Sequence, residues 1–75
     1  MEVRVKLMGM LREKTPTGGT LELPEGATVA QLLQQLDIPA REVMLVTVNG
    51  QHQRDHSVRL SPGDEVTVLP PVGGG

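Results

Sequence analysis

A single segment of the sequence repeats its apolar residues at helical spacing, and this segment limits how the rest of the chain can fold. Its apolar positions, spaced i, i+3, i+4 and i+7, are Val29, Leu32, Leu33 and Leu36. Thr28 and Gln31 form the pattern of a capping box at its start. Pro39 disfavours helical geometry at the residue before it, so the helix should end near residue 36 or 37. One short helix covers only one face of one sheet.

The other apolar stretches are typical of strands. We expect strands over residues 2–7, 20–23, 43–48, 51–53 and 65–69. The first alternates apolar and charged residues, and Asn49-Gly50 predicts a tight hairpin between the third and the fourth. In the third strand, Met44, Val46 and Val48 are expected to face the helix. The sequence therefore predicts an α+β fold, with one main helix packed on one face of a mixed sheet of four to five strands.

The size and composition of the chain exclude several classes of protein. Its 75 residues allow one small domain, and 37% apolar residues argue against disorder from end to end. The chain has no Phe, Tyr or Trp to stack on bases and a formal charge of -2, so nucleic acid is not expected as a partner. Without cysteine it forms no disulfide and no thiolate metal site. No apolar run suits a membrane span and the start is unlike a signal peptide, so we expect a cytoplasmic protein without a membrane partner.

The titratable residues do not form the pattern of a catalytic or metal site. His52 and His56 are the two histidines, and neither has a second imidazole or a thiol at ligand spacing, so we expect no bound metal. Asp64 and Glu65 are neighbours at the start of an expected strand, and neighbours in a strand point to opposite faces, which argues against shared acid-base chemistry. Asp64 is instead expected to be a turn residue.

The last six residues differ from the rest of the chain. Pro70-Pro71-Val72 cannot continue a central strand, and Gly73-Gly74-Gly75 has no side chains to pack, so we expect a domain over residues 1–69 and a flexible tail over residues 70–75. A glycine run fits a narrow channel and lies against a partner's active site, while the prolines keep its base pointing outward. The reactive group would be the Gly75 carboxylate. The alternative is an inert, frayed terminus.

A second candidate site is the sheet face opposite the helix. The strand phases place four residues of interest on this face: Arg4, Lys6, Leu45 and Leu69. Apolar side chains beside basic ones predict a docking surface for an acidic or apolar partner. The alternative is that loops cover the two leucines. Met8 and Met10 could line the same surface, although methionine more often fills gaps in a core.

Taken from end to end, the sequence resembles the ubiquitin-like sulfur carriers of the β-grasp fold, which include the small subunit of molybdopterin synthase and the thiamine-pathway sulfur carrier. The resemblance covers nearly the whole chain and depends on the order of several short motifs. These are Val5-Lys6-Leu7, Leu11-Arg12-Glu13, Leu23-Pro24-Glu25-Gly26-Ala27-Thr28-Val29, Val48-Asn49-Gly50, Gly63-Asp64-Glu65-Val66 and the ending Pro70-Pro71-Val72-Gly73-Gly74-Gly75. In the family the last two glycines are functional, so the resemblance assigns that role to Gly74 and Gly75.

The resemblance implies a carrier that is not an enzyme by itself. An E1-like adenylating enzyme that consumes ATP would activate the carboxylate of Gly75, and a persulfide sulfur donor would convert the adenylate to a thiocarboxylate. The carrier itself would bind no cofactor. A sulfurtransferase or a large synthase subunit would then use the sulfur for cofactor biosynthesis.

The motifs favour the molybdopterin branch of this family without excluding the others. Leu11-Arg12-Glu13 and the Pro-Pro-Val-Gly-Gly-Gly ending resemble the small subunit of molybdopterin synthase, whereas the short link between residues 36 and 43 resembles the thiamine carrier. Met8 also stands where the former commonly has an aromatic residue. Carriers for thiamine, cysteine, homocysteine or transfer-RNA thiolation stay open. So do a ubiquitin-like modifier joined to lysines through Gly75 and a binding module with an inert tail.

Overall fold

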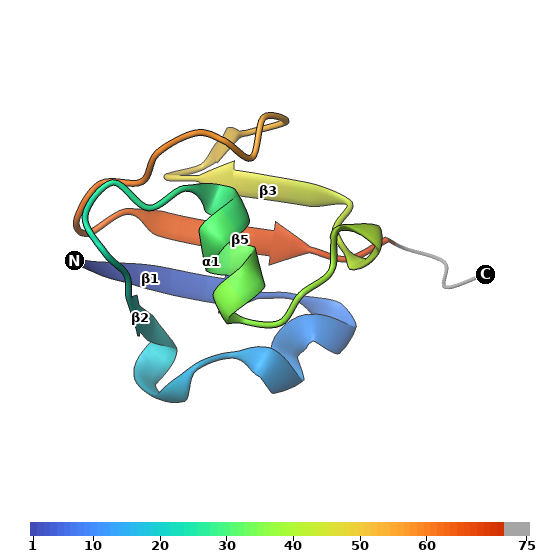
Figure 1. Ribbon diagram of the computed structural model, residues 1–75. Coiled ribbons are helices and arrows are strands. Elements are labelled where there is room, and N and C mark those ends of the chain that lie inside the picture. The colour runs from blue at the N-terminus through green and yellow to red at the C-terminus, as the bar shows by residue number, and fades with distance from the viewer. Residues whose placement is uncertain (72–75) are drawn as a thin grey trace.

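The computed structural model describes residues 1–71, in which one α-helix lies across one face of a five-stranded sheet (Figure 1). The strands are β1 (Glu2–Leu7), β2 (Thr20–Glu22), β3 (Leu45–Val48), β4 (Gln51–His52) and β5 (Glu65–Leu69), and the helix is α1 (Val29–Gln35). The expected α+β fold is confirmed. The expected bounds of the first and last strands are also confirmed, whereas β3 begins two residues later than the apolar run.

The sheet is mixed, and its last strand in the sequence is its central strand. The strand order is β2-β1-β5-β3-β4. β5 runs parallel to β1 with Val5 opposite Val66, and antiparallel to β3 with Val46 opposite Val68. The hairpin partners β2 and β4 form the two edges. Because β5 is paired on both sides, its carboxyl end leaves the sheet at a fixed place between β1 and β3.

The core lies between the sheet and α1. β1 alternates strictly between exposed and buried residues, as its sequence predicts. Apolar side chains from both layers and from the loops fill the space between them: Val3, Val5, Leu7, Leu11, Leu23, Ala27, Val29, Leu32, Leu33, Ile38, Val46, Leu60, Val66 and Val68. No polar side chain is buried in the described part of the chain. Aliphatic side chains alone therefore form this core.

The start of α1 is the capping box expected from the sequence. The Thr28 hydroxyl accepts a hydrogen bond from the Gln31 backbone N–H at 3.2 Å, and the Gln31 side-chain oxygen accepts one from the Thr28 N–H at 2.8 Å. These bonds satisfy two donors that would otherwise lack helical partners. The helix ends at Gln35, in the region predicted from Pro39. α1 is thus fixed at both ends by local sequence.

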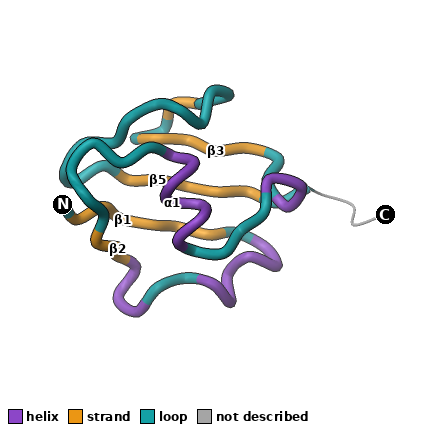
Figure 2. Tube along the Cα trace, in the orientation of Figure 1, coloured by secondary structure: helices purple, strands orange, loops and turns teal. Residues whose placement is uncertain are grey.

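Three short 3₁₀ segments connect the main elements and appear with α1 in purple in Figure 2. They are η1 (Gly9–Lys14), η2 (Thr17–Gly19) and η3 (Ala40–Glu42). The sequence does not predict them, because segments of this length carry no apolar periodicity. η1 contributes Leu11 to the core, so the link between β1 and β2 packs against the domain as a structured connection.

The Asn49-Gly50 hairpin turn is fastened to the start of β5. Both turn residues have positive φ, +53° at Asn49 and +85° at Gly50, as a tight hairpin turn requires. The Asn49 amide donates to Asp64 Oδ1 at 2.9 Å and accepts from the Glu65 N–H at 2.9 Å. Asp64 Oδ2 also accepts from the Ser61 N–H at 2.8 Å, which confirms the expected turn role of Asp64. The hairpin and the central strand therefore hold each other in register.

The expectation for Met44 is wrong. Val46 is buried and Val48 packs against the core, but the Met44 side chain is 61% exposed. Met44 precedes β3 at the end of the sheet from which the strand starts, while α1 crosses the middle of the sheet (Figure 1). Alternation along a strand predicts a side chain's face correctly, yet it does not predict where a short helix stops covering that face.

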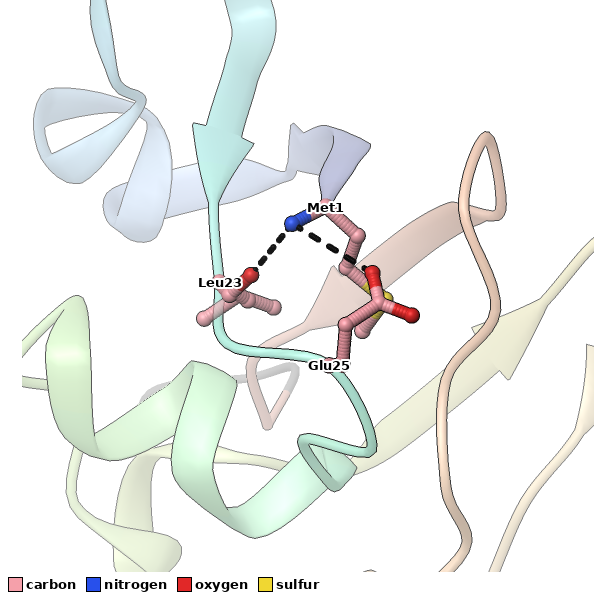
Figure 3. A network of polar contacts seen from close by, with 3 residues as sticks. All are labelled: Met1, Leu23 and Glu25. Carbon is pink, nitrogen blue, oxygen red and sulfur yellow. Dashed lines mark hydrogen bonds and ion pairs between the residues drawn. The ribbon is translucent and has the colours of Figure 1, made fainter.

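The amino-terminal end of β1 is attached to the segment before α1. The Met1 ammonium donates to the Leu23 carbonyl at 2.6 Å and lies 3.8 Å from a carboxylate oxygen of Glu25 (Figure 3). Glu25 is 80% exposed, so its ion pair adds little to stability. The bond to Leu23 extends the pairing between β1 and β2 by one residue.

Candidate functional site

The tail begins at the carboxyl end of β5. Pro70 is half-buried and Pro71 is exposed, while Val72, Gly73, Gly74 and Gly75 lie outside the described residues. In Figure 1 the arrowhead of β5 points to the side of the molecule where η1 and the start of β3 also lie. The predicted flexibility of the tail and the predicted role of the Gly75 carboxylate therefore stay predictions.

Backbone contacts from both neighbouring strands fix the last residues of β5. The Met8 N–H donates to the Val68 carbonyl at 3.0 Å, and the Met44 N–H donates to the Leu69 carbonyl at 2.8 Å. The strand is thus paired up to Val68 on the β1 side and up to Leu69, its final residue, on the β3 side. Whatever follows Leu69 leaves the domain from a rigid base.

Gly9 makes a close approach to the start of the tail. Its φ is +55°, and a Cβ atom placed on it would lie 3.0 Å from Cγ of Pro70. That is well inside the 3.5–4.0 Å at which carbon atoms attract one another. Gly9 therefore lets the η1 backbone pass beside Pro70. Sequence reasoning missed this residue, since one glycine after a strand carries no sign of a distant neighbour.

The sheet face opposite α1 carries the four predicted docking residues. Leu45 lies directly opposite Leu69 in the β3–β5 pair, while Arg4 and Lys6 lie opposite Glu65 and Thr67 in the β1–β5 pair. Arg4 and Lys6 are exposed, whereas Leu45 and Leu69 are half-buried. The structure thus brings the two leucines together at the tail end of the face, with the basic residues further along β1. Glu65 beside Arg4 makes the face mixed in charge.

The two histidines lie outside β5 and outside the segments that hydrogen-bond to its carboxyl end. His52 is exposed in β4, and His56 is half-buried in the loop before Val58. Over residues 1–71 no three side chains of the metal-binding types gather in one place. Ser57 donates hydrogen bonds to the Asp55 carboxylate from its hydroxyl and its N–H, and these bonds lower the pKa of Asp55. This is a local turn.

The described residues also form an open groove of about 550 Å³ on the helix side. It is lined by Lys14, Ala30, Leu33, Gln34, Asp37, Ile38, Pro39, Ala40, Arg41, Glu42 and His56. Its charged residues are of both signs, and none of the predicted tail or docking residues lines it. In the same part of the chain no helix is long and apolar enough to cross a membrane.

The family comparison decides what kind of protein has this geometry. The sequence profile of the ThiS family matches residues 5–75, which include the whole sheet except the first residues of β1 and extend through the glycine ending. The chain belongs to the ThiS family. This confirms the ubiquitin-like sulfur carriers as the group to which the motifs point. No curated protein matches the chain by sequence.

Solved structures with the ThiS-type fold resemble this chain over nearly its full length. A putative molybdopterin converting factor subunit 1 from Pyrococcus furiosus has 27% identity and a TM-score of 0.74, with 96% of this chain and 99% of that chain covered. Small archaeal modifier protein 1 from Haloferax volcanii has 23% identity and a TM-score of 0.75, with 95% and 98% covered. In a complex of subunits 1 and 2 of molybdopterin-converting factor from Helicobacter pylori, the matched chain has 21% identity and a TM-score of 0.63, with 100% of both chains covered. These likenesses confirm the β-grasp fold.

Proposed function

We propose that this protein is a sulfur carrier whose Gly75 carboxylate is activated and converted to a thiocarboxylate, and that it serves as the small subunit of a molybdopterin synthase. The observation that carries the proposal is the match to the ThiS family through residue 75, together with a tail that starts from the central strand of a β-grasp sheet. In this proposal the chain is a co-substrate that presents one reactive group, the carboxylate or thiocarboxylate of Gly75.

The proposed chemistry needs partners because a carboxylate is a poor electrophile. An adenylating enzyme would let the Gly75 carboxylate attack the α-phosphate of ATP, with release of pyrophosphate and formation of an acyl adenylate. The terminal sulfur of a persulfide donor would attack the acyl carbon and expel AMP. A second thiol of the donor would then take up the other sulfur of this acyl disulfide, leaving a donor disulfide and the free thiocarboxylate on the carrier.

In this scheme the carrier itself positions its terminal carboxylate in the active site of a partner. The partners would supply the acid, base and nucleotide chemistry. The sheet face with Arg4, Lys6, Leu45 and Leu69 would dock them. The thiocarboxylate sulfur would attack an electrophilic carbon of the acceptor and displace a leaving group from it. Water would then hydrolyse the bond between the acyl carbon and this sulfur, which leaves the sulfur on the acceptor and returns the carrier with a free carboxylate.

The molybdopterin branch is favoured by the Leu11-Arg12-Glu13 motif and by the likeness to subunit 1 of the converting factor from P. furiosus. The solved complex from H. pylori joins subunits 1 and 2 of such a factor, which supports a large-subunit partner for this chain. A second candidate is a protein modifier, because the likeness to small archaeal modifier protein 1 is equally high by TM-score. Both candidates require adenylation at Gly75.

Intact mass measurement and carboxyl-terminal fragmentation of the protein from its own host test this proposal. A mass increase for one oxygen replaced by sulfur, located at Gly75, supports the carrier. Lysine-linked conjugates ending in Gly75, without thiocarboxylate, would establish the modifier instead. Removal of Gly74 and Gly75 should abolish sulfur transfer and leave the unfolding free energy unchanged, since both follow the expected domain over residues 1–69. Sulfur transfer by the shortened chain at the full rate overturns both candidates.

A further inference from the structure

We propose that Met8, Met10 and Met44 form a methionine collar around the start of the tail, and that this collar packs against the apolar rim of the channel through which a partner enzyme receives the tail. Among residues 1–71 these are the large apolar side chains that stay exposed, at 37%, 68% and 61%. The inference rests on the proposed function, because it assumes that an enzyme acts at Gly75.

The collar is assembled by the sheet topology. Met8 follows β1 and Met44 precedes β3, the two strands on either side of β5, and their backbone N–H groups donate to the carbonyls of Val68 and Leu69. Met10 belongs to η1 and follows Gly9, which lies against Pro70. Two segments far apart in the sequence, residues 8–10 and Met44, thus place exposed methionines around the end of the central strand.

The length of the tail forces an enzyme against this end of the domain. Four residues separate Pro71 from the terminal carboxylate of Gly75, and an extended chain spans at most about 3.6 Å per residue, so the carboxylate lies within about 14 Å of Pro71. An active site buried in a channel must therefore bring the channel entrance up to the residues around Pro71. Those residues include the collar.

The side-chain chemistry of the collar indicates an apolar rim. Large exposed apolar groups at one place on a domain with polar surroundings mark a surface that is covered in a complex. Methionine is flexible and polarizable, so one set of side chains adapts to differently shaped apolar surfaces. The carrier would have to contact two differently shaped surfaces, because the adenylating enzyme and the later sulfur-using enzyme would both bind the same tail.

Steady-state adenylation kinetics with the activating enzyme from the same host test the collar. In the double variant Met10→Gln/Met44→Gln we expect the KM for the carrier to rise about tenfold with kcat unchanged, because docking is weakened while the tail is intact. Met10→Leu/Met44→Leu keeps the apolar surface and should retain a KM within about twofold of the wild type. Ala30→Gln, an exposed change on α1, is the control for a polar side chain elsewhere.

Peroxide gives a second test that leaves the chain length and sequence unchanged. Hydrogen peroxide transfers one oxygen atom to a thioether and leaves water, so the exposed collar methionines become sulfoxides and their surface becomes polar. Met1, whose side chain is 1% exposed, should resist. We expect the oxidised carrier to show the same increase in KM, methionine sulfoxide reductase to reverse it, and a variant with leucine at all three collar positions to be insensitive to peroxide.

The possible results separate the collar from the proposed function. If the wild-type chain is adenylated and the glutamine variant has an unchanged KM, the collar is wrong and the carrier proposal stands. If the wild-type chain is not adenylated at all, the carrier proposal fails and the collar fails with it. Unfolding in urea accompanies each measurement, and because the three side chains are exposed we expect stabilities within about 0.5 kcal/mol of the wild type.

Discussion

Replacing Gly9 with alanine tests whether the base of the tail is held as tightly as the contacts indicate. The substitution adds one methyl group at a residue whose φ is +55°, next to Pro70. Two costs follow. The left-handed conformation is unfavourable for alanine, and the new Cβ would lie 3.0 Å from Pro70 Cγ, so one of the two residues must move.

The structure provides a control that separates these costs. Gly18 has a φ of +76°, but a Cβ placed there meets no atom within 4 Å. Gly18→Ala should therefore cost only the conformational term, about 1 kcal/mol. Gly9→Ala should cost about 2 kcal/mol, because relieving an overpacked contact at half-buried Pro70 adds about 1 kcal/mol, the low end of the range measured for buried sites. In a domain of this size the difference corresponds to about 4–8 °C in Tm.

Urea unfolding followed by circular dichroism measures these values, since the chain has no Trp or Tyr to report by fluorescence. The sharpest control is the Pro70→Ala background, which removes Cγ and with it the close contact. There Gly9→Ala should cost no more than Gly18→Ala does in the wild type. Equal destabilisation of the wild-type protein by Gly9→Ala and Gly18→Ala, within about 0.3 kcal/mol, would show that Pro70 does not lie firmly against residue 9. That result would refute the argument for a fixed tail base.

Three further predictions follow from the capping box, the Asp55 turn and the sheet face. Thr28→Ala should lower the unfolding free energy by about 1 kcal/mol while Thr28→Ser keeps most of it, as measured by urea unfolding; equal losses would exclude the capping bond as the cause. Ser57→Ala should raise the pKa of Asp55 towards its ordinary value in an NMR titration, because the Ser57 bonds that lower it are weakened. A lowered pKa stabilises the fold above the ordinary carboxyl pKa of about 3.9, and that contribution is lost as the pH falls through the folded value, so stability of the two proteins should converge in acid. Leu69→Glu should weaken adenylation and lower the unfolding free energy by about 1 kcal/mol, because Leu69 is half-buried. Val68→Glu should unfold the domain, because Val68 is 0% exposed. Similar stability of the two variants, measured by urea unfolding, would contradict the assignment of faces.

Much of the fold could be predicted because local and global signals agree. The alternation in β1, the capping box of α1 and the Asn49-Gly50 turn each depend on neighbouring residues, and the structure confirms all three. The order in which strands pair depends on distant contacts instead. Nothing local in the sequence of β5 shows that it lies between β1 and β3. The exposure of Met44 also depends on a distant element, because α1 does not extend far enough to cover this residue.

The candidate site could be predicted only in part. Arg4, Lys6, Leu45 and Leu69 share a face because strand alternation is a local rule, and the structure places them so. Gly9 lies close to Pro70, and Met8 and Met44 both bond to the end of β5, so these contacts join segments up to about sixty residues apart. A pattern of residue types does not show such distant contacts. The family match, which extends through Gly75, adds the assignment to the ThiS family, which the geometry alone does not provide.

The central place of the last strand also governs when this protein becomes folded during synthesis. β5 supplies Val66 and Val68 to the middle of the core and pairs with both β1 and β3, so a nascent chain that lacks it has a divided sheet. The domain therefore completes its fold only after residue 69 has left the ribosome, and by then residues 70–75 have all been made. An enzyme that recognises the folded sheet would accordingly encounter finished chains and pass over incomplete ones.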